Sequence, residues 1–419
     1  MRHRGLVGLG VAALIALPWI LSQGLLNASI QMLIAALFAC AYNLLSGQAG
    51  MLSFGHAAYF GVGAFGTVHA MNAFRGAGLL PTPLLPVAGA VAGLIIGAIV
   101  GWFATQRTGP YFAMITLAIA ELLHSLAPHL RGLFGGEAGV STMRMPSLGL
   151  TFGSTTQVYI LVLAWVLASL LALYLYMLTP VGRLTLGLRE NAHRLRFLGY
   201  NVHNLSVLVF SVSAMFSGIA GSLQVINNEA ANYVVFDSSV SASVVLNTYI
   251  GGVRVFLGPA LGAALMTFFG YAVSDLTQSW LLYQGIVFAL VMVFMPSGLA
   301  GLFEKSESLH RRFGAAPLAP FFAFALGAAV LIIAGAVFVV ELMQRMFSQD
   351  YRALATTARP WPPIPLFGRQ WSPTSPETWL VPVVSIGVGA ACVFLARHVL
   401  FKLQDRQESR VSATPFNQH

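Results

Sequence analysis

SGQAGMLSFGHAAYFGVGAF, residues 46–65, breaks a long apolar region with five glycines set among polar side chains such as Gln48 and His56. In lipid, every backbone N–H and C=O group needs a partner, so a glycine-broken polar segment is stable only against other protein or a water-filled path. Close packing between helices is the alternative explanation for each glycine taken singly. The clustering with polar residues favours a segment that lines a path through a membrane.

Composition places the chain among polytopic α-helical membrane proteins. Its 419 residues are 57% hydrophobic and only 8% charged, with a mean hydropathy of +0.77, whereas ordinary soluble domains are about a quarter charged. The net charge of +9 is explained by basic cytoplasmic loops and gives no reason to expect nucleic-acid binding. Cys40 and Cys392 each lie in an apolar run, which indicates packing rather than a disulfide framework or a metal site.

Apolar runs of about 20 residues, each long enough to cross a bilayer, recur along the chain. They predict a transmembrane helical bundle of about 10 core spans plus 2 extra C-terminal spans. The first run is read as an uncleaved helix. With the N-terminus placed inside, most of the 22 Lys and Arg residues fall on the cytoplasmic side, so both termini are predicted to be cytoplasmic. The runs lie near residues 5–23, 28–46, 53–74, 84–104, 111–130, 156–178, 205–226, 239–256, 258–276, 282–300, 318–344 and 378–398.

Three further patterns predict local structure. Gly89, Gly93, Gly97 and Gly101 recur every fourth residue, which lines one helix face with glycine and lets another helix approach closely. Residues 131–155 are expected to be an irregular external loop, and the proline-rich residues 348–377 an extended, polyproline-like one. The polar tail after residue 401 is expected to be disordered.

Few residues offer chemistry. Glu121 is the acidic residue near the middle of a predicted span, and His124 follows three positions later on the same helix face. An ionisable group at that depth is a functional candidate, although a carboxyl group held for helix packing is the alternative. The sequence has no HExxH, GxSxG, CxxC or Gly-Lys pair, so no enzyme, metal site or ATP-binding P-loop is expected.

Residues 179–208 form a second distinctive stretch. Residues 188–198 are consistent with a short amphipathic helix with Leu188, Leu195 and Leu198 on one side, and Gly199 as its C-terminal cap. Such a helix docks into another protein's groove or lies on the membrane surface. A solvated basic loop is the alternative.

Several stretches together resemble the permease subunits of branched-chain amino acid ABC importers, in particular the longer of the two permease types in that family. The resemblance covers about residues 28–302 and rests on five motifs in this order. They are GQAGMLSFGHAAYFGVGAF (47–65), TGPYFAMITLAIAELL (108–123), RENAHRLRFLGYNVHNLSVLVFSVSAMFSGIAGSL (189–223), IGGVRVFLGPALGAAL (250–265) and FMPSGLAGL (294–302).

The resemblance implies a permease domain at residues 1–302 and an extension at 303–419, the latter with two spans, the proline-rich external loop and the cytoplasmic tail. It also implies a bacterial inner-membrane location. Its implied partners are membrane lipid, a second permease of the family, two ATP-binding cassette ATPases and a periplasmic or extracellular solute-binding protein. No cofactor is expected on this chain, because ATP is used by the partner subunits.

Two sets of site residues follow from the resemblance. The first is a short cytoplasmic helix that docks on the ATPase, where the chain departs from the family pattern at His193 and Arg194. The second is a translocation path near the interface with the second permease. The coupling residues are Arg189, Glu190, Asn191, Leu195, Leu198 and Gly199. The path residues are Asn43, Gln48, Ser53, His56, Glu121, Asn247, Gly251 and Gly252.

Branched-chain amino acids are the first expected cargo, with urea or short amides as the alternative within the family. An ion-coupled secondary transporter is the alternative class, and it is disfavoured because charged residues are nearly absent from the spans. A membrane-embedded enzyme lacks the residues for catalysis.

Overall fold

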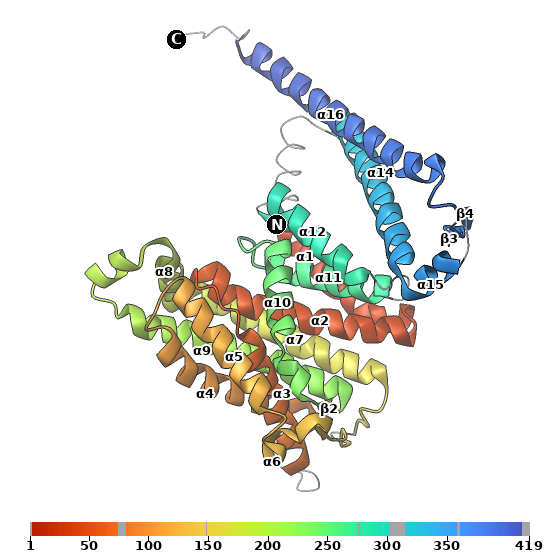
Figure 1. Ribbon diagram of the computed structural model, residues 1–419. Helices are drawn as coiled ribbons and strands as arrows, with labels where there is room; N and C mark the ends of the chain where they lie inside the picture. Colours follow the sequence, from red (N-terminus) through yellow and green to blue (C-terminus); the bar gives the residue numbers. More distant parts are fainter. Residues whose placement is uncertain are drawn as a thin grey trace, which may run out of the picture. The chain divides into compact units, whose positions relative to one another are not determined.

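A computed structural model describes residues 2–73, 81–147, 149–274, 277, 279–295, 297–301, 315–357 and 361–412. The chain divides into two compact units. Unit 1 comprises Met1–Ala272 with Gln284–Leu302, and unit 2 comprises Val273–Tyr283 with Phe303–His419. Both are built from helices, which confirms the predicted helical bundle (Figure 1). Residues 302–314, which include the predicted domain boundary, and residues 413–419 of the predicted tail lie outside the described part of the chain.

The elements of unit 1 follow one another in a largely helical order. Its helices are α1 (Arg2–Ile20), α2 (Gln23–Asn43), α3 (His56–Ala73), α4 (Pro86–Ala104), α5 (Pro110–Leu126), α6 (Arg131–Phe134), α7 (Thr155–Leu178), α8 (Pro180–Phe197), α9 (Val202–Asn228), α10 (Ser238–Gly251), and most of α11 (Gly258–Ser274) and α12 (Trp280–Phe294). Its short elements are the turns η1 (Leu44–Gln48), η2 (Thr82–Leu84), η3 (Gly136–Ala138) and η4 (Tyr233–Phe236), and the strands β1 (Val140–Ser141) and β2 (Ala230–Ala231).

Each of the twelve apolar runs contains a helix. Among the described residues, six helices are long and apolar enough to cross a membrane, or seven if the bent pair Pro110–Leu126 and Arg131–Ala138 is one span. Shorter apolar helices occupy Gly10–Ile20, Gly258–Ser274 and Trp280–Val293. The number of spans therefore stays a prediction.

Helices α3, α4 and α9 pack closely against one another in unit 1. All four glycines of the α4 stripe are buried and face α9, which confirms the predicted close approach of another helix. A Cβ atom on Gly93 would lie 2.5 Å from the carbonyl oxygen of Ala214, and one on Gly63 would lie 2.3 Å from Gly218 Cα. These backbones touch directly, which only glycine allows.

The glycine-rich stretch 46–65 joins α2 to α3 through a broken helix. The end of α2 widens into the π-helical turn η1, a rare geometry that is common at functional sites. Gly50 follows in the left-handed region (φ +71°), which a glycine adopts without strain. The chain then runs without regular structure until α3 begins at His56.

Residues 131–155 are largely irregular, as expected, and they are tied to the end of α9. Val140 and Ser141 pair antiparallel with Ala231 and Ala230. The Arg144 guanidinium donates from Nε to Glu229 Oε1 at 3.0 Å. This clasp holds the loop over one end of unit 1.

Unit 2 corrects two expectations. It contains α14 (Ala315–Phe347), α15 (Gln349–Thr357), the hairpin strands β3 (Ile364–Leu366) and β4 (Arg369–Trp371), and α16 (Pro376–Ser412). The expected extended loop at 348–377 is therefore wrong in part, because it holds a helix and a hairpin. The expected disordered tail is also wrong for residues 402–412, because α16 continues to Ser412, whereas residues 413–419 lie outside the described part of the chain.

Candidate translocation and coupling sites

His56 lies at the centre of a polar junction between α2, α3 and α9. Its Nε2 lies 2.9 Å from Ser213 Oγ, and its Nδ1 lies 3.1 Å from Ser53 Oγ. The Ser213 hydroxyl donates to Ala41 O at 2.7 Å, so its oxygen accepts the proton of His56 Nε2. The Ser53 hydroxyl then donates to Nδ1, which makes His56 a neutral imidazole. The side chains of Ser53 and His56 are fully buried, and they connect the broken stretch to Ser213 on α9.

Aromatic rings surround this junction. The His56 ring makes edge contacts with Tyr42 (5.0 Å between centroids), Tyr59 (5.5 Å) and Phe210 (6.1 Å). The hydroxyl groups of Tyr42 and Tyr59 are buried without a hydrogen-bond partner among the described residues. His56 therefore belongs to a closed core rather than to a cavity wall.

Two more of the predicted path residues lie at the ends of the turn η1: Asn43 is the last residue of α2, and Gln48 is the last residue of η1. Asn43 is 4% exposed, and its Oδ1 has no hydrogen-bond partner in the described part of the chain. Gln48 is half-buried. Ser46 Oγ lies 3.1 Å from the hydroxyl group of Tyr249, which links the turn to α10.

Unit 1 contains a cavity of about 480 Å³ near its clasped end, here called the amide cavity. Its polar lining consists of amides and hydroxyls, among them Gln31, Gln224 and Asn247. Its apolar wall includes Ile34, Phe38 and Phe60. No described lining residue carries a charge. Asn247 is 8% exposed, and its buried Oδ1 lacks a hydrogen-bond partner among the described residues.

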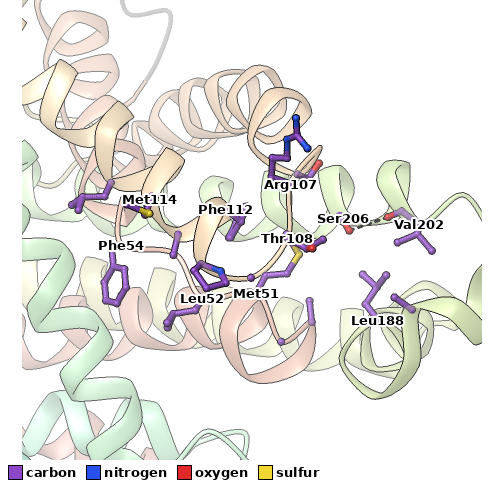
Figure 2. A pocket seen from close by; sticks show the side chains of 18 of the residues that line it. Met51, Leu52, Phe54, Arg107, Thr108, Phe112, Met114, Leu188, Val202 and Ser206 are labelled. Atoms are coloured by element: carbon purple, nitrogen blue, oxygen red, sulfur yellow. Dashed lines mark hydrogen bonds between the residues drawn. The ribbon is translucent and has the colours of Figure 1, made fainter.

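A second cavity, of about 900 Å³, lies beside α8 and is here called the α8 cavity (Figure 2). The broken stretch supplies Met51, Leu52 and Phe54 to its wall, and α5 supplies Phe112 and Met114. Its basic lining residues are Arg107, His193 and Arg196, and no described lining residue is acidic. Three parts of unit 1 therefore meet at the α8 cavity: the loop between α4 and α5, the end of α8 and the start of α9.

Helix α5 exposes a face that the described residues do not cover. Tyr111 is 71% exposed and Met114 67% exposed, and Glu121 is half-buried with no hydrogen bond or ion pair among the described residues. His124 does not pair with Glu121. Its Nε2 lies 3.7 Å from Asp237 Oδ2 instead. Hydrogen bonds from Ser239 chiefly lower the pKa of Asp237, with a smaller contribution from His124.

Gly251 and Gly252 serve close packing. A Cβ atom on Gly251 would lie 2.1 Å from Gly258 O. Gly252 is left-handed (φ +106°), and a Cβ atom there would lie 2.5 Å from Ser297 O. These two predicted path residues thus hold α10 against its neighbours and do not line either cavity.

Helix α8 is broken near its end. Asn191 has extended backbone angles (φ −162°, ψ 92°), and its Oδ1 accepts a hydrogen bond from the Arg194 backbone N–H at 3.0 Å. Asn191 thus caps a separate short helix, residues 192–197, here called the tip helix. Gly199 (φ +87°) ends it, because Tyr200 N bonds to Leu195 O and Gly199 N to Arg196 O. This Schellman arrangement confirms the predicted glycine cap.

The side chains around the tip helix point in different directions. Leu195 is buried (6% exposed) and packs on Gly187, whereas Glu190 is exposed. Phe197 is 91% exposed and Leu198 66% exposed. The Arg189 Nη1 donates to Gly47 O at 2.6 Å. Phe197 was missed at the level of sequence, although a Phe outside the apolar patch of an amphipathic helix is a usable signal.

Comparison with known proteins identifies the relatives of this chain. A family model described as the branched-chain amino acid transport system permease component matches residues 24–296. The high-affinity branched-chain amino acid transport system permease protein LivM of Escherichia coli K12 is 26% identical over 318 residues, which cover 70% of this chain and 74% of that protein. No solved structure matches the chain.

Two further relatives extend this pattern. The probable branched-chain amino acid transport permease protein LivM of Methanocaldococcus jannaschii is 24% identical over 275 residues, 58% of this chain and 77% of that protein. The ribose import permease protein RbsC of Haemophilus influenzae is 30% identical over 136 residues, 31% of this chain and 42% of that protein. The family match spans the broken stretch, both cavities and the tip helix, and it confirms the resemblance drawn from the motifs. The chain belongs to the family of branched-chain amino acid transport system permease components, as a LivM-like member.

Proposed function

We propose that this chain is the transmembrane permease subunit of an ATP-binding cassette importer that carries branched-chain amino acids or a related small polar solute. Separate ATPase subunits drive it, and a second permease and a solute-binding protein complete the assembly. The observation that carries the proposal is the capped tip helix, which presents Phe197 (91% exposed) and Leu198 (66% exposed) in a chain of the permease family.

The tip helix fits the role of ATPase contact. A large apolar side chain fully exposed to water is stabilised by about 1.5–3 kcal/mol when a partner buries it. Aromatic anchors of this kind supply most of the energy of many interfaces. The caps at Asn191 and Gly199 hold the short helix in shape before the partner arrives, which lowers the entropic cost of binding. With α8 on the cytoplasmic side, this contact faces the ATPases.

The two cavities fit opposite ends of a path. In the predicted topology the amide cavity lies toward the outside and the α8 cavity toward the cytoplasm. Along the chain, the closed junction of His56 and Tyr59 lies between Phe54, which lines the α8 cavity, and Phe60, which lines the amide cavity. Such an arrangement suits a gated path, in which the closed junction separates a cavity that opens to the outside from a cavity that opens to the cytoplasm.

The unpartnered carboxyl group of Glu121 is a reason to place the second permease against α5. A half-buried carboxyl group with no described partner is costly in contact with lipid tails. A second permease that covers the α5 face would remove Glu121 from lipid and give it polar or aqueous surroundings. The path then runs between two permeases, with α5 of this chain as one wall.

Glu121→Gln is expected to reduce initial solute uptake by about tenfold or more, the effect of losing a hydrogen bond that the carboxylate would make to the solute or to the second permease. The amount of protein in the membrane should stay unchanged, because Glu121 bonds to no described residue. Uptake of labelled solute is measured beside Glu137→Gln, an exposed carboxyl group in η3, which should leave uptake as in the wild type. Wild-type uptake by Glu121→Gln would assign Glu121 to helix packing.

The lining of the amide cavity supports a small polar cargo with an apolar part. Amide groups hydrogen-bond either an α-amino acid or an uncharged amide, and the wall of Ile34, Phe38 and Phe60 suits an aliphatic side chain. The absence of charge among the described lining residues keeps urea or short amides as the alternative cargo. Competition of unlabelled isoleucine and acetamide against ATP-dependent uptake of labelled leucine separates the two. Inhibition by acetamide alone would favour the amide cargo.

A further inference from the structure

Arg189 occupies a special place between the tip helix and the broken stretch 46–65. Its Nη1 donates to Gly47 O at 2.6 Å. The same side chain lies on Gly50, where an added Cβ atom would meet Arg189 Cγ at 3.0 Å and Arg189 Cα at 3.2 Å. Two glycines of the broken stretch therefore contact Arg189. Gly47 accepts its hydrogen bond, and Gly50 leaves room for its side-chain stem because glycine has no Cβ atom.

The geometry of η1 leaves Gly47 O to the guanidinium group. Met51 N, the N–H that an α-helix would direct to Gly47 O, bonds to Leu45 O instead. A carbonyl that lacks a helical partner needs another donor. Among the described residues, the Arg189 guanidinium is the donor to this carbonyl oxygen.

The tip helix packs on the part of α8 that carries Arg189, in spite of the backbone break at Asn191. Leu195 on the tip helix packs onto Gly187 in the first part of α8, with its Cδ2 atom 3.1 Å from the position of an added Cβ atom. Leu195 is 6% exposed, so this contact is closely packed. Movement imposed on the tip is thereby carried to residues 187–189 and on to Gly47.

The turn η1 is in turn connected to the elements that form the two cavities. Ser46 contacts the Tyr249 hydroxyl on α10, and α10 carries Asn247 of the amide cavity. Residues 49–54, just after the turn, line the α8 cavity. A displacement of Gly47 therefore reaches both cavities.

We propose that Arg189 is a positioning residue that transmits movement of the tip helix to the broken stretch through Gly47 O, and that it does not itself contact the ATPase. This inference rests on the proposed function, because it requires a partner that moves the tip. It changes the role expected for Arg189 from the sequence, where it stood among the residues docking on the ATPase. The π-helical turn η1 is consistent with this role, because such turns occur frequently at functional sites.

The test uses the full complex of both permeases and the ATPases in proteoliposomes, with Arg189→Met and Arg189→Lys in this chain. Arg189→Met is expected to retain ATPase co-purification and ATP hydrolysis, while the solute moved per ATP falls by about tenfold or more. Arg189→Lys should restore part of the coupling, because an ammonium group still donates to Gly47 O. Arg183→Met, an exposed position on the same helix, is the matched control and should couple normally.

Two results would overturn the inference: normal solute transport per ATP by Arg189→Met, or loss of ATPase co-purification from Arg189→Met alone, which would place Arg189 in the ATPase contact. If Arg189→Met does not accumulate, Gly50→Ala serves instead, because the added methyl group displaces the Arg189 stem; normal coupling in that variant would equally overturn the inference. A wild-type complex that shows no ATP-dependent uptake would refute the proposed function instead, so the two failures are distinguishable.

Discussion

Phe197→Asp is expected to abolish co-purification of the ATPase subunits while the permease accumulates in the membrane at its usual level. Phe197 is 91% exposed and makes little contribution to the fold of unit 1. At the centre of an interface, an aromatic anchor of this type contributes about 2–4 kcal/mol, which is roughly 30- to 1,000-fold in affinity. A carboxylate at the same position adds the cost of burying an unpaired charge.

A matched control separates the tip helix from exposed apolar residues in general. Phe401, near the end of α16, is 66% exposed and lies on the same predicted side of the membrane. Phe401→Asp should co-purify with the ATPases as the wild type does. Undiminished co-purification of Phe197→Asp would show that the ATPases bind elsewhere, and the tip helix would lose its assigned role.

The second large effect is expected at the contact of α4 with α9. Gly218→Val should prevent accumulation of folded protein, because a Cβ atom at Gly218 would lie 2.3 Å from Gly89 O and 3.3 Å from Gly93 Cα. Both atoms belong to backbone and cannot rotate away. Overpacking of a tight core costs about 1–3 kcal/mol and more where the backbone must move, and valine adds three carbon atoms at this point.

The measurement is the amount of monodisperse protein recovered in mild detergent, with Gly285→Ala as the control. Gly285 lies in α12 with no atom within 4 Å of an added Cβ atom, so that variant should behave as the wild type. Recovery of Gly218→Val at the wild-type level would mean that α4 and α9 are not packed through their glycines.

The sequence predicted the helices and one contact face well. The four-residue repeat of glycines in α4 identified a close approach because each glycine falls on one side of the helix. It did not identify α9 as the partner, since many helices carry small residues. That choice depends on which surfaces fit together in three dimensions.

The single helix predicted at 188–198 is wrong in part, because the chain breaks at Asn191 and residues 188–190 belong to the first part of α8. The pattern of Leu188, Leu195 and Leu198 suggested one apolar patch. In the structure Leu195 turns inward onto Gly187, while Leu198 stays exposed. Periodicity shows which residues share a helix face, but not which face the rest of the chain covers, and the break at Asn191 changes the register between the two parts.

Unit 2 shows how burial overrides composition. Proline content favoured an extended loop at 348–377. The structure instead forms the β3–β4 hairpin, in which Ile364 and Leu366 pack against Phe338 and Leu342 of α14. Composition indicates only the average conformational preference of a segment. This hairpin is stabilised by its apolar contacts with α14, a helix that lies earlier in the chain.

The predicted path residues separate into groups that sequence alone does not distinguish. Asn247 lines the amide cavity, and Glu121 lies on the uncovered face of α5. Ser53 and His56 lie in the closed junction. Polar groups within a membrane either satisfy the protein's own backbone or meet a solute, and only their hydrogen-bond partners tell these uses apart. Their role in the path stays a prediction.

The central claim is that this chain moves solute only as part of an ATP-driven assembly. The direct measurement is uptake of labelled leucine by proteoliposomes that contain this chain alone, or this chain with the second permease, the ATPases and the solute-binding protein. We expect ATP-dependent uptake by the complete assembly, unaffected by ionophores that collapse ion gradients, and no uptake by the chain alone. Uptake by the chain alone, driven by an ion gradient without ATP, would contradict it.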